Sequence, residues 1–325
     1  MTLLALEPRL TSELDAFVAR YAHLHPYERA WEIEAWGLTL TDPLLRAAFA
    51  EVWTPTRIAK LGPEELEALL AEIGVSEIEE PFAMEKGTSA WAVSEKWRAM
   101  LDRDTSAHEE LFLGLAATMF WTKRRADEPS DEMIYDRLVE GELLAARQQW
   151  VAACDCWAFF WDSVRGRMPK TQRRAAGIKG LFRGAVIEAW AERYATALVQ
   201  GSRESDGQVE RGLAFIDEYL SLFPGTGGTA GWVLQAAKGR FQIVRGRYQE
   251  GFARFEALVR ENPQSPAPYR ALVEAFLAAK QPPLAITNRA LAVARKALGA
   301  GVDADGRLSL AGLVERLSDV PDIDA

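Results

Sequence analysis

Residues 232–263 carry small and aromatic side chains at the spacings expected of two short helices that pack closely together. The pattern consists of Trp232, Gly239, Gly246, Tyr248, Gly251, Phe255 and Pro263. Small residues at positions 239 and 251 let two antiparallel helices approach each other, and aromatic rings fill the space beside that contact. The proline ends the second helix because it cannot continue the backbone hydrogen bonding. A period of about 34 residues is typical of stacked helix pairs, and the spacing therefore predicts one such pair.

Related patterns precede and follow this unit. One period further on, a second copy begins at Pro266 and differs in its turn, at residues 280–283. Its matching positions are Tyr269, Leu272, Phe276 and Ala285. Two earlier copies cover residues 134–167 and 178–224. The pattern resembles that of the tetratricopeptide repeat (TPR) family, and four units satisfy the need for at least three stacked units to bury a continuous core.

The resemblance implies an α-α superhelix of TPR-like repeats, and together with helix signals in the N-terminal part it predicts an all-α fold in which the repeats follow an N-terminal helical domain. In the first 125 residues, Pro63 and a capping box formed by Ser106 and Glu109 indicate helix starts, and no family resemblance is visible. Residues 75–82 are predicted to form an extended loop, and the domain boundary is placed in the polar segment 126–131. The expected domains are a helical domain over 1–126, the TPR-like repeats over 130–300, and a capping helix with a tail over 301–325.

The resemblance also implies a binding surface, because TPR proteins form their concave wall mainly from one face of the first helix of each unit. The residues at those positions are Val233, Ala236, Arg240, Ile243 and Val244, then Ala267, Arg270, Glu274, Leu277 and Ala278, and in the first unit Tyr135, Leu138, Glu142, Ala145 and Ala146. The expected partner contacts among them are Tyr135, Leu138, Glu142, Arg240, Ile243, Arg270 and Glu274. A mostly apolar lining with isolated charges favours an amphipathic helix over a charged tail. That helix belongs either to a partner or to the protein's own N-terminal domain.

Charge is distributed unevenly along the chain. Residues 1–125 carry 13 Lys and Arg against 21 Asp and Glu, and thus contribute −8 to a formal net charge of −9. Residues 165–183 hold seven basic residues and no acidic one, and within this run Arg173 and Arg174 are candidate contacts to nucleic acid or to an acidic partner. The basic residues do not fall on one helical face, so nucleic acid is disfavoured. The preferred interpretation of this run is a solvated joint or a contact with the acidic N-terminal domain.

Candidate catalytic and metal-binding patterns are incomplete. His23 and His25, with Glu28 nearby, have no third histidine close in the sequence, and His108 lacks the second histidine of a zinc-protease helix. The glycine-rich segment 225–231 follows an amphipathic segment and not the strand that a dinucleotide loop requires. Cys154 and Cys156 lie two residues apart on a predicted helix and do not face each other. The sequence therefore predicts neither a cofactor nor a metal, and no enzyme activity.

The N-terminal segment lacks the basic start of a signal peptide, and the apolar run 111–121 is too short to span a bilayer. We therefore expect a cytoplasmic protein without a membrane partner. The favoured function is a non-enzymatic adaptor, scaffold or regulatory subunit that binds a helical segment of another protein in its repeat groove. Two alternatives remain: a helical enzyme or small-ligand sensor with a site at the interdomain junction, and binding of nucleic acid or an acidic partner through residues 165–183. Oligomeric state leaves no trace in the sequence.

Overall fold

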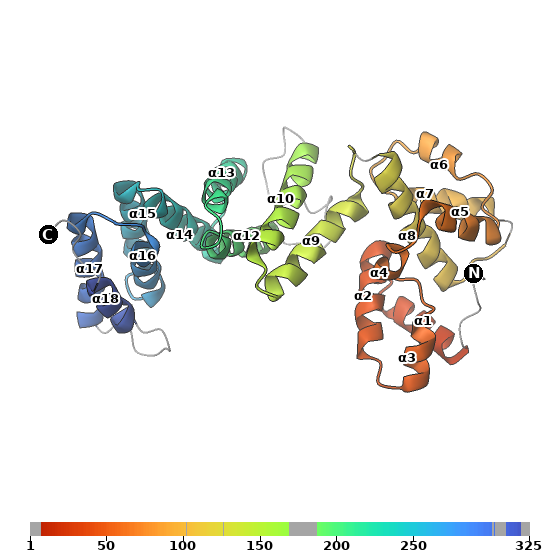
Figure 1. The fold of residues 1–325 in the computed structure, drawn as a ribbon, viewed down its shortest axis with the longest axis horizontal. Coiled ribbons are helices and arrows are strands. Elements are labelled where there is room, and N and C mark those ends of the chain that lie inside the picture. The colour runs from red at the N-terminus through yellow and green to blue at the C-terminus, as the bar shows by residue number, and fades with distance from the viewer. Residues whose placement is uncertain are drawn as a thin grey trace. The chain divides into compact units, whose positions relative to one another are not determined.

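The computed structural model describes residues 8–101, 103–125, 127–168, 187–300, 302 and 310–319. Within these ranges the chain forms seventeen helices and no strand (Figure 1). The predicted all-α fold class is therefore confirmed.

The chain divides into two compact units. Unit 1 consists of residues 1–139 and 159–167, and unit 2 of residues 140–158 and 168–325. The division falls within α9 (Asp131–Ala146) and α10 (Trp150–Arg167), which each contribute to both units.

Unit 1 is built around one buried helix. Its helices before α9 are α1 (Pro8–Arg20), α2 (Pro26–Thr39), α3 (Pro43–Phe49), α4 (Pro55–Ile58), α5 (Pro63–Glu72), α6 (Glu79–Met84), α7 (Trp91–Met100) and α8 (Ala107–Arg124). Residues 111–118 of α8 are all buried, and this helix contacts α1, α2, α4, α5 and α7. A helix that is apolar on all sides becomes the centre of a helical core, and these five helices of unit 1 pack around α8.

Local sequence signals explain where several of these helices begin. Pro43 and Pro63 occupy the first turn of α3 and α5, where a missing backbone N–H costs nothing. The Asp42 side chain accepts hydrogen bonds from the first backbone N–H groups of α3, and Ser106 and Glu109 form the predicted capping box of α8. These signals are local, which is why the sequence alone identified them.

The extended loop predicted for residues 75–82 is wrong in its second half. Residues Glu79–Met84 form α6, a helix of six residues. Its Pro81 and Phe82 are buried, and the Phe82 ring packs edge-on against Trp97 with 5.6 Å between the ring centroids. Burial of this aromatic side chain against α7 stabilises a short helix that has little propensity of its own.

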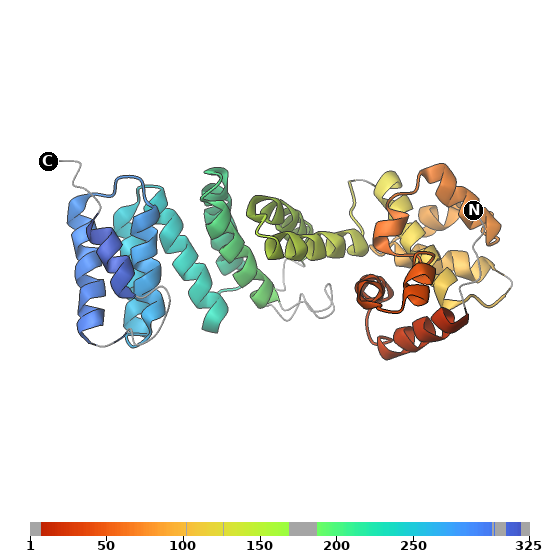
Figure 2. The ribbon, with the colours of Figure 1, turned by 60° about the horizontal axis from the view of Figure 1, so that its bottom comes forward.

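Unit 2 is an ordered stack of helices. After the contributions of α9 and α10 it contains α12 (Ile187–Gly201), α13 (Gly207–Leu222), α14 (Gly228–Val244), α15 (Tyr248–Glu261), α16 (Pro266–Ala278), α17 (Leu284–Gly299) and α18 (Leu310–Ser318). From α12 onward each helix contacts the next one along the chain, and α12, α14, α16 and α18 also contact one another in that order. These four helices therefore form one row, and α15 lies beside α17 in a second row (Figure 2).

The pair α14–α15 shows why small residues recur in this part of the chain. A Cβ atom on Gly251 would lie 2.6 Å from the carbonyl oxygen of Gly239 in α14, and one on Gly239 would lie 2.9 Å from the Phe255 ring in α15. The turn between the helices contains Gly246 at a φ of 79°, a conformation that favours glycine. The two helices run antiparallel and pack almost backbone to backbone along this contact.

Candidate binding groove

A groove with a volume of about 750 Å³ lies within unit 2. Its wall is formed by the ends of α12 and α13, by α14 and α16 with the residues that follow each of them, and by α18. The lining residues are Ser202, Arg203, Asp206, Val209, Arg240, Val244, Arg245, Glu274, Leu277, Ala278, Lys280, Leu313 and Arg316.

Three helices of the row, α14, α16 and α18, each present one stripe of side chains to this groove. In α14 the stripe consists of Arg240 and Val244, four residues apart, and in α16 Glu274 is followed by Leu277 at a distance of three residues. Residues three or four apart lie on the same face of a helix. The groove is therefore a property of three helices aligned in a row, and no single loop creates it.

Arg240 is the buried charge of the groove, with an exposed fraction of 7%. Its Nη1 lies 3.7 Å from a carboxylate oxygen of Glu274, and its Nε is buried without a hydrogen-bond partner among the described residues. Burial lowers the pKa of Arg240, and the nearby positive charge of Arg203 lowers it further, whereas Glu274 acts in the opposite direction. The guanidinium is thus only partly compensated by its own protein.

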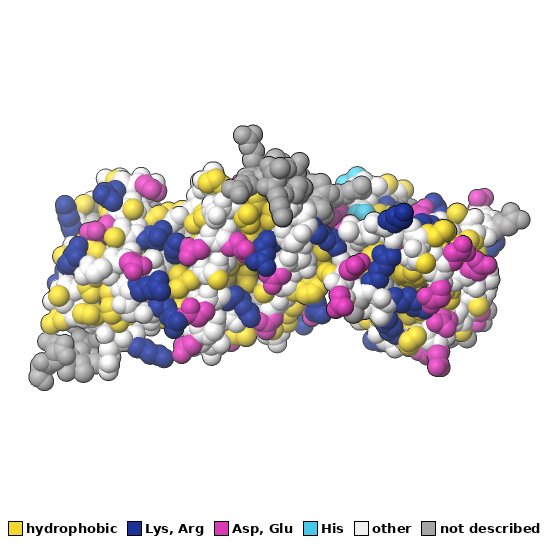
Figure 3. All heavy atoms as spheres, turned by 90° about the horizontal axis from the view of Figure 1, so that it is seen from above, with side chains coloured by type: hydrophobic (Ala, Val, Ile, Leu, Met, Phe, Trp, Pro, Cys, Tyr) yellow, Lys and Arg dark blue, Asp and Glu magenta, His cyan; other side chains and the backbone are white. Residues whose placement is uncertain are grey.

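Positive charge predominates at the exposed edge of the groove. Arg203, Arg245, Lys280 and Arg316 face two acidic lining residues, Asp206 and Glu274. Arg245 pairs with Glu210 outside the lining, and the ion pair between Lys280 and Asp206 spans 3.9 Å with both side chains almost fully exposed. Such an exposed pair contributes little. Elsewhere, the face drawn in Figure 3 shows cationic and anionic side chains interspersed over both units.

The structure brings together part of the predicted contact set. Arg240 and Glu274, predicted from two different repeat units, both line the groove and pair with each other, and Val244, Leu277 and Ala278 lie beside them. Ile243 is fully buried instead, and its Cγ1 would lie 2.6 Å from a Cβ on Gly251, so it belongs to the α14–α15 contact. Arg270 is partly buried in α16 and is not a lining residue.

The remaining predicted contacts lie elsewhere or outside the described ranges. Tyr135 and Leu138 belong to unit 1, where the Tyr135 ring packs edge-on against Tyr27, and burial raises its pKa. Glu142 belongs to unit 2 and pairs with Arg193 at 2.8 Å. Arg173 and Arg174 lie outside the described residues.

Sequence reasoning missed most of the cations of the groove. Arg203 and Lys280 follow the ends of helices, and Arg316 lies in the short helix α18, so none of them occupies a position that the repeat pattern marks. One signal was present in the sequence: Arg316 follows Leu313 by three residues on an amphipathic helix, which places both on adjoining parts of one face.

The histidines of unit 1 serve local structure. His25 and Glu28 form the capping box of α2, in which the Tyr27 N–H donates to His25 Nδ1 and the His25 N–H donates to a Glu28 carboxylate oxygen. His108 accepts a hydrogen bond from the backbone N–H of Trp53 at 3.1 Å, and burial lowers its pKa to about 4. Among the described residues no group of three or more His, Cys, Asp or Glu side chains is arranged to hold a metal ion.

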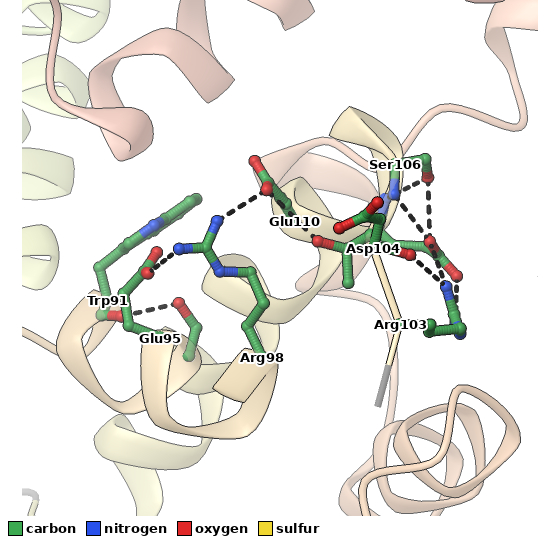
Figure 4. Close-up of polar contacts among 10 residues, drawn as sticks. Trp91, Glu95, Arg98, Arg103, Asp104, Ser106 and Glu110 are labelled. Carbon is green, nitrogen blue, oxygen red and sulfur yellow. Dashed lines mark hydrogen bonds and ion pairs between the residues drawn. The ribbon is translucent and has the colours of Figure 1, made fainter. Parts of the chain in front are cut away.

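A second polar cluster in unit 1 joins the end of α7 to the start of α8 (Figure 4). The Arg98 guanidinium lies between Glu95, at 2.5 Å, and Glu110, at 2.8 Å, and Arg103 donates to the carboxylate of Glu109. Every carboxylate named here has a cationic partner, which fits a role in holding two helices together.

Two carboxylates of α9 attach this helix to the rest of unit 1. Asp136 accepts hydrogen bonds from the Tyr27 hydroxyl at 2.6 Å and from the Trp31 indole N–H at 2.9 Å. The buried Glu132 accepts hydrogen bonds from Ser89 and from two backbone N–H groups at the start of α7. Burial raises the pKa of Asp136 to about 6. All the groups that these carboxylates bind belong to the protein itself, so the cluster is structural.

No protein-family model, curated protein or solved structure matches the chain. None of the helices in the described part of the chain has the length and apolar character required to cross a bilayer. The groove of unit 2 and the helices that form it are therefore the features from which a function can be inferred.

Proposed function

We propose that this protein is a TPR-like helical-repeat adaptor or regulatory subunit, cytoplasmic and non-enzymatic, whose groove in unit 2 binds a segment of another protein. The observation that carries the proposal is the groove itself, lined by one stripe from each of α14, α16 and α18. The alternating contacts of unit 2, in which α12, α14, α16 and α18 touch in order, are those of stacked helix pairs and support a superhelical arrangement.

The lining chemistry favours a protein segment over a nucleic acid. Apolar side chains such as Val244, Leu277 and Leu313 lie beside the charged ones, which suits a segment with one apolar and one charged face. Proteins that bind single-stranded nucleic acid stack its bases on aromatic side chains, and no aromatic residue is among the lining residues given above. The bound segment is accordingly a peptide, held along the row of helices.

The proposal is tested by filling the groove. Ala278→Trp places a large ring on its lining, whereas Ala285→Trp places the same ring on an exposed position of α17 outside the groove and serves as the control. The full chain and both variants are purified from the native cells at mild salt, and the recovered proteins are quantified by mass spectrometry. We expect a defined set of partners that is lost with Ala278→Trp and retained with Ala285→Trp. Identical recovery with the two variants, or no partner with the wild type, would contradict the proposal.

A further inference from the structure

The charge of the groove opposes the charge of the chain. The protein carries a formal net charge of −9, yet the groove is lined by five cationic residues and two acidic ones. A groove lined mainly by cationic residues attracts acidic segments, even though the protein as a whole is acidic. The sign of the charge on the ligand can therefore be inferred from the lining.

Arg240 supplies a second and independent indication. Its side chain is more than nine-tenths buried, its Nε has no hydrogen-bond partner among the described residues, and its ion pair with Glu274 is long at 3.7 Å. A buried donor without a partner is costly, and a charged one more so. Arg240 lines the groove, and a carboxylate offers two oxygens to a guanidinium in one plane. An incoming acidic side chain can therefore pair with a guanidinium that Glu274 compensates only partly.

The exposed cations extend this preference along the edge of the groove. Arg203 and Arg316 are exposed and have no carboxylate within ion-pair distance in the described ranges. The positive charge of Arg203 is close enough to Arg240 to lower its pKa. An anion between the Arg203 and Arg240 side chains would relieve the repulsion between these two positive charges, whereas a neutral or cationic group would not.

The apolar lining restricts the ligand further. Val244 and Leu277 lie one turn or less from Arg240 and Glu274 on their helices, so apolar and charged contacts are available within the same short length of groove. In a helical ligand, residues three or four apart share a face. An acidic residue three or four positions from Leu, Ile or Val would meet both kinds of contact.

Resting on the proposed function, we propose that the groove selects protein segments that carry acidic side chains three or four residues from apolar ones, and that one of these carboxylates binds the guanidinium of Arg240. The carboxylate is that of an internal Asp or Glu of the ligand. Arg240 is the anchor of this contact, and Arg203 and Arg316 attract the segment electrostatically.

The test uses a display library of random 16-residue peptides and the full chain as bait. Peptides are counted as groove ligands when Ala278→Trp abolishes their binding and Ala285→Trp does not. We expect these peptides to be enriched in Asp and Glu at three or four residues from aliphatic residues. One enriched peptide is then synthesised with both ends blocked, and its affinity is measured by fluorescence anisotropy against the wild type and four variants of the chain.

The variants test the contribution of Arg240 separately from that of the exposed cations Arg203 and Arg316. Arg240→Met removes the anchor, Arg203→Glu and Arg316→Glu reverse charges at the edge, and Arg260→Glu reverses an exposed charge on α15 outside the groove as a control. Arg240→Met is expected to weaken binding about tenfold or more, the usual effect of losing a hydrogen bond to a charged group. Replacing the critical Glu of the peptide by Gln should weaken binding to the wild type by a similar factor and have little further effect on Arg240→Met.

The outcomes distinguish this inference from the function on which it rests. Groove peptides that lack acidic residues, or that bind Arg240→Met as tightly as the wild type, would overturn the selection for acidic segments and leave the docking groove in place. A library that yields no peptide sensitive to Ala278→Trp would overturn both. Equal losses with Arg260→Glu and the two edge variants would show a general charge effect and would likewise overturn the assignment of Arg203 and Arg316.

Discussion

Gly251→Ala is expected to destabilise unit 2, because the substitution adds one methyl group to the contact between α14 and α15. The new Cβ would lie 2.6 Å from the backbone carbonyl oxygen of Gly239 and 2.6 Å from Ile243 Cγ1, whereas ordinary contact begins at 3.4 Å. Since one of these neighbours is backbone, no change of rotamer relieves the overlap. The two helices must separate by several tenths of an ångström along a tightly packed face.

The magnitude follows from two opposing effects. Overpacking of a well-packed contact costs about 1–3 kcal/mol, and the backbone contact places this site in the upper part of that range. Alanine is about 1 kcal/mol better than glycine within a helix. The expected net loss in the free energy of unfolding is therefore about 1–2 kcal/mol, which lowers the melting temperature of a unit of this size by about 2–8 °C.

The assay compares three glycine-to-alanine variants of the full chain. Hydrogen exchange of α14 and α15 amides, followed by mass spectrometry at increasing urea, reports the stability of this helix pair. Gly299→Ala is the control, because a Cβ at that position of α17 meets nothing within 4 Å. Gly239→Ala should fall between the two, since the Phe255 ring that it meets at 2.9 Å can move. If Gly251→Ala were as stable as Gly299→Ala, the close approach of the two helices would be refuted.

Three further predictions concern buried ionisable side chains. Burial raises the pKa of the Asp136 carboxyl from 3.8 to about 6, so the folded protein binds the carboxyl proton more tightly than the unfolded chain does. The free energy of unfolding should therefore rise as the pH falls from 6 towards 4, by up to about 3 kcal/mol. Urea titrations should show a smaller rise for Asp136→Asn, and a pH dependence equal to that of the wild type would count against this role of Asp136. Burial lowers the pKa of His108 from 6.5 to about 4, so the unfolded chain binds a proton at this histidine first and the free energy of unfolding falls over the same range of pH. His108→Phe should remove this fall, at a cost of about 1–3 kcal/mol at pH 7, because it leaves the backbone N–H of Trp53 unpaired. A decrease in stability with acid as steep as in the wild type would refute this role of His108. Arg240→Met should melt at the wild-type temperature or above, because an apolar side chain replaces a poorly paired buried charge; a fall of more than about 1 kcal/mol in unfolding free energy would show that the Glu274 pair stabilises the fold.

The helical character of the chain could be predicted from the sequence because its signals are local. The capping box of Ser106 and Glu109 and the prolines at helix starts act within one turn, and the structure places helices where these signals indicate. The helix α6 was missed for the opposite reason. Residues 79–84 have no capping signal, and the helix is stabilised by the packing of Phe82 against Trp97, a contact with a residue of another helix.

In the candidate groove, too, the sequence identified residues marked by local spacing and missed those that only tertiary packing brings together. The repeat spacing marked Arg240 and Glu274, because residues at equal phase on neighbouring helices of a row reach the same face. It also marked Ile243, which lies on the adjacent side of α14 and is buried against α15. The cations Arg203 and Lys280 could not be predicted, because they follow helix ends that tertiary packing brings to the groove. The spacing of Leu313 and Arg316 indicated a shared helix face, but only tertiary packing brings that face of α18 to the groove.

The most direct measurement is site-specific photo-crosslinking of the full chain in its native cells. A photoreactive phenylalanine analogue replaces Ala278, on the groove lining, or Ala285, on the exposed side of α17. If the groove is a docking surface, light should join a partner protein to position 278 through a segment with acidic and apolar residues, and position 285 should give no such product. The same products from both positions, or no product from position 278, would contradict the account.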